Sequence, residues 1–472
     1  MTAITRRISE FAAGIAFDRL PGEVVERTGM LIMDCVGIAL RARHDAESTP
    51  GLIKAAARLG LDGGSNVAIG EEQGFRPAGA AMVNGTLMHS LDFDDTHAAG
   101  SLHSSAPIVP AAFAAAEMAG ADGKALIQAI VAGYEVQIRL SLALGPSDHY
   151  DRGFHPTATC GVFGAAAAAG RILGLDEDRM ARAFGIALSE SAGSMQFLAD
   201  GAWTKRSHVG HAAMSGLIAA TLASEGFRGP ADAFEGKAGF FAAYAPNPVP
   251  EKAVEGFNER WETMAIAVKP YPSCRYSHAP MDALVELRAE HGIEPDDIEE
   301  VEIGIAETGW KLIGDPEADK QNPKSVVDGQ FSMPFCAAVA LREGGLKWDD
   351  YPKHLEDSKT LDLCRRVQTV PDAKAEAEFP KNLSGVARVK TKGSQFEAFV
   401  AVPKGEPDNF LTTEELRAKF ESLAGPYLAP GRIDELAARL LAIHRENDVG
   451  EVLRLTRPEM APVAAGVRVA GE

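Results

Sequence analysis

The first 265 or so residues are dominated by runs of small, helix-forming residues and contain few alternating β-branched segments. Runs such as 165–169, which is five consecutive alanines, favour helix and let neighbouring helices approach closely. We expect helices near 107–120, 125–144, 157–173 and 208–225, after an earlier helix that follows Pro21. This part of the chain is therefore predicted to form a helical bundle.

The pattern changes near Val268. Residues 298–308 alternate with period two, as a strand does, and 384–407 resemble a hairpin whose turn is Lys392-Gly393-Ser394. An apolar helix is expected between them at 333–342. After Pro407 the helical pattern returns.

These patterns predict a mainly α fold with an α+β insertion. We expect a large all-helical domain formed by both chain ends, with residues 1–267 as its first part. Residues 408–472 would rejoin it as C-terminal helices. Residues 268–407 would form a smaller α/β lid inserted between the two parts.

Composition narrows the class of protein. The chain has 472 residues, 46% of them hydrophobic and 24% charged, which is an ordinary globular balance. Five scattered cysteines without a CxxC pair argue against a disulfide framework and a structural zinc site, and favour a reducing compartment. The N-terminal segment lacks a long apolar stretch, so we expect no signal peptide. The apolar run 157–170 is too short to span a bilayer. We therefore expect a cytoplasmic protein that does not bind a membrane.

The formal net charge of -19 argues against a nucleic-acid partner, because an acidic surface repels phosphate backbones. The same field would repel an anionic substrate at long range. If the substrate is anionic, the cations that bind it must be concentrated in a pocket.

The most distinctive string is HSLDFDDTH at 89–97, in which Asp92, Asp94 and Asp95 lie close together. Neighbouring like charges raise pKa values and can create an acid or base at neutral pH. This string has three alternative interpretations: a magnesium site, the proton donor of a helical terpene cyclase, or a helix N-cap followed by solvated acids. The cyclase is disfavoured because only 7% of the residues are aromatic.

Four other segments place a histidine or a cation at an expected helix start or at the junction of the two regions. They contain, in chain order, His103, then His155, then Lys205 with His208, and finally Lys269, Arg275 and His278. Helix N-termini favour anions. Together these groups would form a receptor for two or three carboxylates.

The chain resembles the MmgE/PrpD family, which includes 2-methylcitrate dehydratase, cis-aconitate decarboxylase and iminodisuccinate epimerase. The resemblance covers nearly the whole chain and is carried by LDFDDTH, GFHPTATCGVFGAAAAA, DGAWTKRSHVGHAA, KPYPSCRYSH and DGQFSMPFCAAVAL, in that order. It implies a homodimer without metal or other cofactor, with an active site between the helical domain and the lid. By motif, the implied site residues are Asp92, Thr96, His103, His155, Lys205, His208, Lys269, Arg275 and His278.

All reactions of this family break a C–H or C–C bond next to a carboxylate, and the charge that develops requires fixed cations. We expect Lys205, Lys269 and Arg275 to bind substrate carboxylates. His103 and His155 would transfer protons, with Asp92 and Thr96 orienting them.

By this resemblance, Met333 stands where the decarboxylases carry a lid tyrosine. The expected reaction is therefore dehydration of a 2-hydroxy polycarboxylate such as 2-methylcitrate or citrate. The alternatives are decarboxylation of cis-aconitate, epimerisation of an iminodisuccinate-like substrate, and carboxylate binding without catalysis.

Overall fold

The structure is a computed structural model that describes residues 1–199 and 201–457. The chain divides into two compact units. The first unit contains Met1–Ala267 and the chain from Thr413 onward, and the second contains Val268–Thr412. The predicted fold class is confirmed, since the chain is mainly helical with a smaller α/β part.

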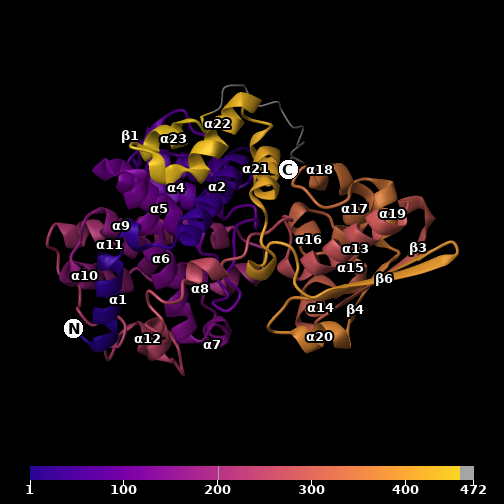
Figure 1. Cartoon of the computed structure of the whole chain (residues 1–472), viewed down its shortest axis with the longest axis horizontal. Helices are drawn as coiled ribbons and strands as arrows, with labels where there is room; N and C mark the ends of the chain where they lie inside the picture. Colours follow the sequence, from indigo (N-terminus) through magenta and orange to yellow (C-terminus); the bar gives the residue numbers. More distant parts are fainter. Residues whose placement is uncertain (200, 458–472) are drawn as a thin grey trace. The chain divides into compact units, whose positions relative to one another are not determined.

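The first unit is built from helices (Figure 1). They are α1 (Ala3–Gly14), α2 (Gly22–Asp45), α3 (Thr49–Arg58), α4 (Pro77–Met88), α5 (Ser105–Ala119), α6 (Gly123–Leu144), α7 (Pro146–Asp151), α8 (Pro156–Thr159), α9 (Gly161–Ile172), α10 (Glu177–Leu188), α11 (Thr204–Ser224), α12 (Phe240–Tyr244), α21 (Thr413–Ala424), α22 (Pro430–Leu441) and α23 (Val449–Arg454). A two-stranded antiparallel sheet, β1 (Asp62–Val67) with β2 (Gly74–Phe75), departs from the all-helical prediction.

Small residues bring α11 very close to its neighbours α4 and α9. A Cβ atom added to Gly210 would lie 2.2 Å from Thr86 Oγ1 on α4, and one added to Gly216 would lie 2.4 Å from Ala165 Cβ on α9. Glycine is therefore required at these contacts. The close packing places the first turn of α11 beside the loop that follows α4.

The expected helix at 157–173 is divided in the structure. The short helix α8 ends at Thr159 and α9 begins at Gly161, with Cys160 between them. The C-terminal helices α21 and α22 pack against α2, and α23 packs against α5 (Figure 1). Residues more than 300 positions apart are thus neighbours within the first unit.

The second unit contains a four-stranded sheet in the order β4-β3-β5-β6. Its strands are β3 (Ile298–Ile305), β4 (Val367–Pro371), β5 (Gly385–Thr391) and β6 (Ser394–Val400). Its helices are α13 (His278–His291), α14 (Glu307–Ile313), α15 (Glu317–Lys320), α16 (Val326–Gln330), α17 (Met333–Glu343), α18 (Asp350–His354), α19 (Ser358–Cys364) and α20 (Ala373–Glu378). The predicted hairpin is confirmed, with Thr391 opposite Ser394.

The parallel pairing of β3 with β4 was not expected from the sequence. Val301 lies opposite Val367 on one side and Val389 on the other, and all three side chains are fully buried. Helix α13 packs on β5 and β6, and α17 packs on α13. The apolar face of the sheet is covered in this way, as a half-buried sheet requires.

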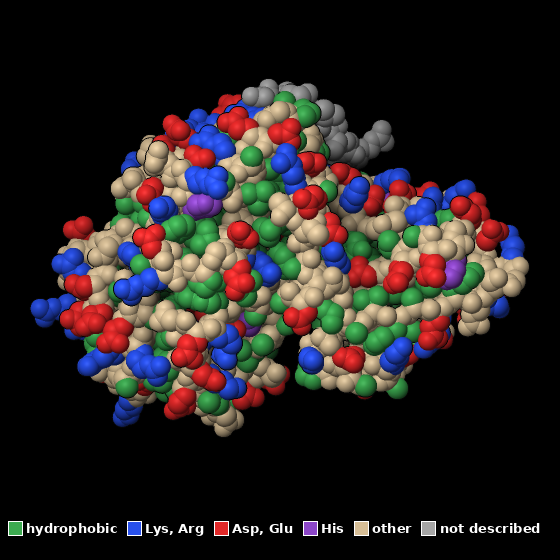
Figure 2. Space-filling model, viewed as in Figure 1, with side chains coloured by type: hydrophobic (Ala, Val, Ile, Leu, Met, Phe, Trp, Pro, Cys, Tyr) green, Lys and Arg blue, Asp and Glu red, His purple; other side chains and the backbone are tan. Residues whose placement is uncertain are grey.

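Surface and core agree with the composition. All five cysteines are buried and free of disulfides. Figure 2 shows basic side chains interspersed with acidic ones on the visible face of each unit. Among the helices that the structure describes, none is both long enough and apolar enough to cross a bilayer.

Candidate active site

The loop between α4 and α5 carries the three aspartates, and each has a different partner. Asp92 adopts a positive φ of 52°, an unusual backbone conformation that often accompanies function in non-glycine residues. Its Oδ1 lies 2.7 Å from Lys205 Nζ, at the start of α11. Burial alone would lower the pKa of Lys205, but the Asp92 carboxylate outweighs burial and raises it. Lys205 is therefore a fixed cation.

Asp94 is fully buried, and its carboxylate lies beside two imidazole rings. His89 Nδ1 donates to Asp94 Oδ2 at 2.7 Å. His103 Nδ1 lies 3.1 Å from the same oxygen, off the direction of a straight hydrogen bond. Burial would raise the pKa of Asp94, but His103 and His89 outweigh it and hold this pKa well below its ordinary value. Asp94 is thus an anion between two rings.

Asp95 binds the start of helix α5. Its Oδ1 accepts the backbone N–H groups of Ser104 and Ser105 at 3.1 Å each, and its Oδ2 accepts from the Ser105 hydroxyl. Burial raises its pKa to about 6, against the opposing effect of these hydrogen bonds. Asp95 thus stabilises the start of α5 from outside the helix, where Ser104 holds the N-cap position. The alternative of an N-cap aspartate followed by solvated acids is wrong, because Asp94 and Asp95 are fully buried.

His155 lies at the centre of a row of rings. It is the residue before α8, and its ring centroid lies 5.8 Å from that of His89 and 5.8 Å from that of His208. Phe197 contacts it edge-on at 6.1 Å. Burial is the main cause that holds the pKa of His155 well below 6.5, and electrostatic repulsion from His89 and Lys205 lowers this pKa further. His155 is therefore neutral at pH 7.

Three buried ring nitrogens in this row have no hydrogen-bond partner among the described residues: His89 Nε2, His155 Nδ1 and His208 Nδ1. Buried polar atoms in native proteins are almost always paired. Three unpaired nitrogens on neighbouring rings indicate that a polar ligand completes the site.

His103 is positioned through its backbone. Its N–H donates to Thr157 Oγ1 at 3.1 Å, and Gln137 Nε2 donates to the carbonyl oxygens of both His103 and Thr157, at 3.1 and 3.2 Å. Helices α6 and α8 therefore fix the turn that presents its ring. With 13% of its side chain exposed, His103 is more accessible than His89 or Asp94.

Thr96 lies on the same loop and is fixed by a pair of backbone hydrogen bonds with Ala267, at 2.9 and 2.8 Å. Of the sequence-predicted residues, the first unit thus brings Asp92, His103, His155, Lys205 and His208 into one neighbourhood.

The remaining predicted residues lie together in the second unit. Lys269 is buried, with 3% exposure. Arg275 pairs with Glu406 and donates to His278 Nδ1 at 3.2 Å, while His278 Nε2 donates to the Ser273 carbonyl at 3.3 Å. These contacts fix the tautomer of His278. They also engage the Arg275 guanidinium inside the unit, which favours positioning of His278 over direct substrate binding.

The comparison with known families decides the relationship. Profiles for the MmgE/PrpD N-terminal domain and the MmgE/PrpD C-terminal domain match residues 6–253 and 271–442. The chain belongs to the MmgE/PrpD family. The C-terminal family domain extends beyond the second unit, since it also includes α21 and α22.

Within the MmgE/PrpD family, the chain is similar over almost its full length to proteins named as cis-aconitate decarboxylases. The chain is 27% identical to cis-aconitate decarboxylase of Aspergillus terreus, over 96% of each chain. It is 28% identical to the cis-aconitate decarboxylase of Homo sapiens, over 98% of this chain and 97% of the human protein. It is also 28% identical to a cis-aconitate decarboxylase-like protein, oryM, of Aspergillus oryzae, over 97% and 98%.

Decarboxylases are lyases, so the predicted lyase class is supported at that level, but the predicted hydro-lyase subclass is not. The sequence argument against decarboxylation used Met333. This side chain is fully buried in the hydrophobic core of the second unit, at the start of α17. A buried methionine has no proton to donate, so Met333 itself takes no part in proton transfer. That it replaces the lid tyrosine of the decarboxylases stays a prediction.

A metal ion is the alternative occupant of the carboxylate cluster. His89, Asp94 and His103 offer three ligand atoms within 4.8 Å of one another. The two Nδ1 atoms converge on a single carboxylate oxygen, however, which is the arrangement of an imidazole–carboxylate network. Metal independence stays a prediction, and chelation tests it.

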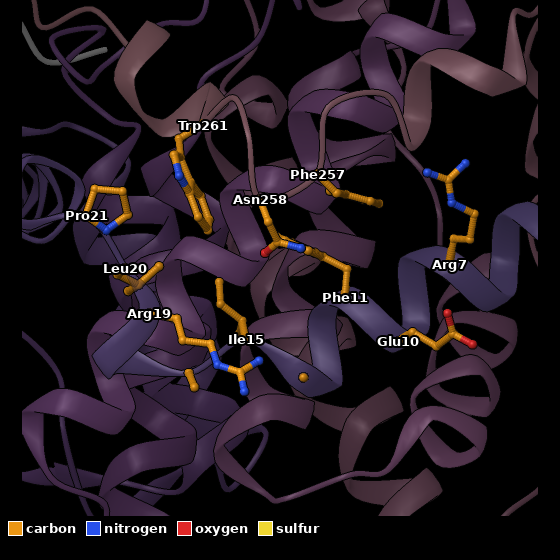
Figure 3. Close-up of a pocket in the computed structure, with 12 residues that line it drawn as sticks. Arg7, Glu10, Phe11, Ile15, Arg19, Leu20, Pro21, Phe257, Asn258 and Trp261 are labelled. Carbon is orange, nitrogen blue, oxygen red and sulfur yellow. The ribbon is translucent and has the colours of Figure 1, made fainter.

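The described residues of the first unit border at least two hollows. One of about 280 Å³ is bordered by His208, His211, Met82 and Leu52, next to the row of histidines. A larger one of about 680 Å³ lies between α1 and the segment 257–261 (Figure 3). None of the predicted site residues lines it.

Sequence reasoning missed His89 and Asp94 as site residues, although both lie in the string that it selected. Their spacing of five residues across a helix end was the available signal. The sequence also gave no sign that Lys419 on α21 contacts Phe93 in this string, because more than 300 residues separate them.

Proposed function

We propose that the chain is a carboxy-lyase that acts on cis-aconitate or a closely similar tricarboxylate. The observation that carries the proposal is the cluster of imidazoles at Asp94: His89 and His103 lie on its carboxylate, and His155 lies next to His89. The fixed cation Lys205 pairs with Asp92 on the same loop. The relatives named as cis-aconitate decarboxylases, which match almost the full length of the chain, support this reaction over dehydration.

The chemistry requires one proton donor and no redox change. The C–C bond to one carboxylate breaks, CO₂ leaves, and the electron pair remains on the carbon chain as the double bond shifts. A proton then forms a new C–H bond. His103 is the proposed donor because it is the most accessible ring on Asp94, whose buried charge would stabilise an imidazolium.

Neutral His155 and His89 have a different proposed part. Their lowered pKa values make them poor cationic donors at pH 7 but suitable hydrogen-bond partners and proton acceptors. The unpaired Nδ1 of His155 and Nε2 of His89 would orient the substrate or return a proton to His103. Asp92 and Thr96 would hold Lys205 and the loop in place.

The carboxylates need cations, since the chain carries a net charge of -19. A lysine ammonium has three donors, so Lys205 can keep Asp92 and still bind a substrate carboxylate. Lys269 is proposed as a second carboxylate ligand, His208 and His278 as hydrogen-bond donors, and Arg275 as the residue that positions His278.

Dehydration of a 2-hydroxy polycarboxylate is the second candidate. It needs a base for a C–H proton and an acid for the departing hydroxyl. Neutral His155 beside the Asp94–His103 pair offers both. Epimerisation would use the same two groups, and binding without catalysis would use only the cations.

The other properties proposed for the chain follow the family resemblance: a cytoplasmic homodimer that needs no cofactor, with a small di- or tricarboxylate as its partner. Light scattering after size exclusion tests the dimer, since a monomeric mass would contradict it.

Incubation with cis-aconitate, citrate, 2-methylcitrate and malate, followed by mass spectrometry and CO₂ measurement, tests the proposed function. We expect CO₂ release from cis-aconitate only, and its loss in His103→Ala. His291→Ala is the control, because His291 is an exposed histidine at the end of α13 and belongs to no part of the proposed site. Water loss from citrate or 2-methylcitrate without CO₂ would favour the second candidate.

A further inference from the structure

A buried ion pair contacts the loop between α4 and α5 that carries the three aspartates. Lys419 of α21 has its Nζ 2.5 Å from Asp34 Oδ1 on α2, and 6% and 1% of the two side chains are exposed. The same Nζ donates to the Phe93 carbonyl at 3.1 Å and lies 3.8 Å from the centroid of the Phe93 ring. Lys419 thus contacts both the backbone and the side chain of one loop residue.

Phe93 separates the two functional carboxylates of the loop. Asp92 precedes it and pairs with Lys205, while Asp94 follows it and holds the two imidazoles. A shift of the Phe93 peptide would therefore move both carboxylates at once. Asp92 also has a positive φ, a conformation that persists only when the surrounding contacts enforce it.

Stability alone explains this pair poorly. Desolvating two charges offsets most of their attraction, and apolar residues of similar volume are often at least as stable in such places. The lysine instead has two directed contacts to Phe93 in addition to its ion pair. A charge, a hydrogen bond and a ring contact that converge on one peptide are suited to fixing its position.

We propose that Lys419, anchored by Asp34, is a positioning residue that clamps the Phe93 peptide and so sets the placement of Asp92 and Asp94. The catalytic consequence rests on the proposed function, whereas the clamp itself does not. In this arrangement the C-terminal part of the chain supports a site whose proposed proton-transfer groups, His89, His103 and His155, come from residues 89–155.

The test removes both charges together, so that neither is left buried alone. In Asp34→Asn/Lys419→Met, hydrogen–deuterium exchange of peptides covering 91–95 should become at least about tenfold faster, since the clamp's contribution to local protection is lost. The kcat should fall at least about tenfold while KM changes less than about threefold, as expected for misplaced catalytic groups.

The matched control is Arg41→Met/Asp45→Asn. This pair also lies on α2, and Asp45 accepts from Tyr427 of the C-terminal segment, so it joins the same parts of the chain. It should leave exchange in 91–95 and kcat near wild type. If the double variant fails to fold, Asp34→Asn alone, which is nearly isosteric, should raise exchange in the same peptides.

Wild-type exchange in 91–95 together with wild-type kcat, in a folded variant lacking the clamp, would overturn the proposal. Should the wild-type enzyme turn over none of the acids, the proposed function fails. The exchange comparison would still decide whether the clamp exists.

Discussion

Replacing Lys205 by alanine is the sharpest single perturbation of the site. The side chain is 27% exposed, its Nζ lies 2.7 Å from Asp92 Oδ1, and its charge acts on both His155 and His89. The change removes one positive charge and leaves the Asp92 carboxylate facing the substrate. Both effects act against binding of a trianion.

The size of the effect follows from Coulomb's law. Two unit charges about 4 Å apart interact by about 4 kcal/mol at an effective dielectric of roughly 20. Partial exposure screens this attraction, and a discount to about 3 kcal/mol still corresponds to roughly a hundredfold in rate. We therefore expect Lys205→Ala to lower kcat/KM at least about a hundredfold.

Steady-state kinetics on the identified substrate, with circular dichroism to confirm folding, measures this loss. Lys54→Ala is the control, since Lys54 is an exposed lysine on α3 and should be neutral. If Lys205→Ala keeps its efficiency within a few-fold of wild type, Lys205 does not bind the substrate and the site is misplaced.

Three further outcomes are expected. His155→Ala should lower kcat by about 10² to 10⁴ with little change in KM, while the control His291→Ala should not; an unchanged kcat for His155→Ala would remove His155 from proton transfer. Because burial lowers the pKa of His89 from 6.5 to about 4, only the unfolded chain gains a proton at this residue as pH falls between these values. Over this pH range His89 should therefore lower the free energy of unfolding by up to about 3 kcal/mol. Asp95, whose pKa burial raises to about 6, should raise the free energy of unfolding over part of the same range. On acidification from pH 6.5 to 4, thermal melts of His89→Gln should show a smaller loss, or a larger gain, of stability than those of the wild type, and the same change in both proteins would contradict this pKa. Exhaustive chelation should leave activity unchanged, so loss restored by a divalent ion would mean that the His89 cluster holds a metal.

The fold was predictable because it depends on local patterns. Small-residue helices, the period of 298–308 and the turn after Thr391 all act over a few residues. The parallel strand β4 was missed because its partner β3 is distant in sequence and only packing joins them.

The site was partly predictable for the same reason. The string 89–97 identified three aspartates, but not that Asp95 binds the start of a helix while Asp94 holds two rings. That division depends on which helix approaches each carboxylate. The contact of Lys419 with Phe93 has no local signal, since α21 returns from the far end of the chain.

Reaction with cis-aconitate in D₂O tests the central claim most directly. Carboxy-lyase chemistry predicts one CO₂ released and one deuterium incorporated at carbon for each substrate consumed, because the new C–H bond takes its proton from a solvent-exchangeable group. Both signals should disappear in His103→Ala. Conversion of cis-aconitate or citrate by addition or loss of water, without CO₂, would contradict the account.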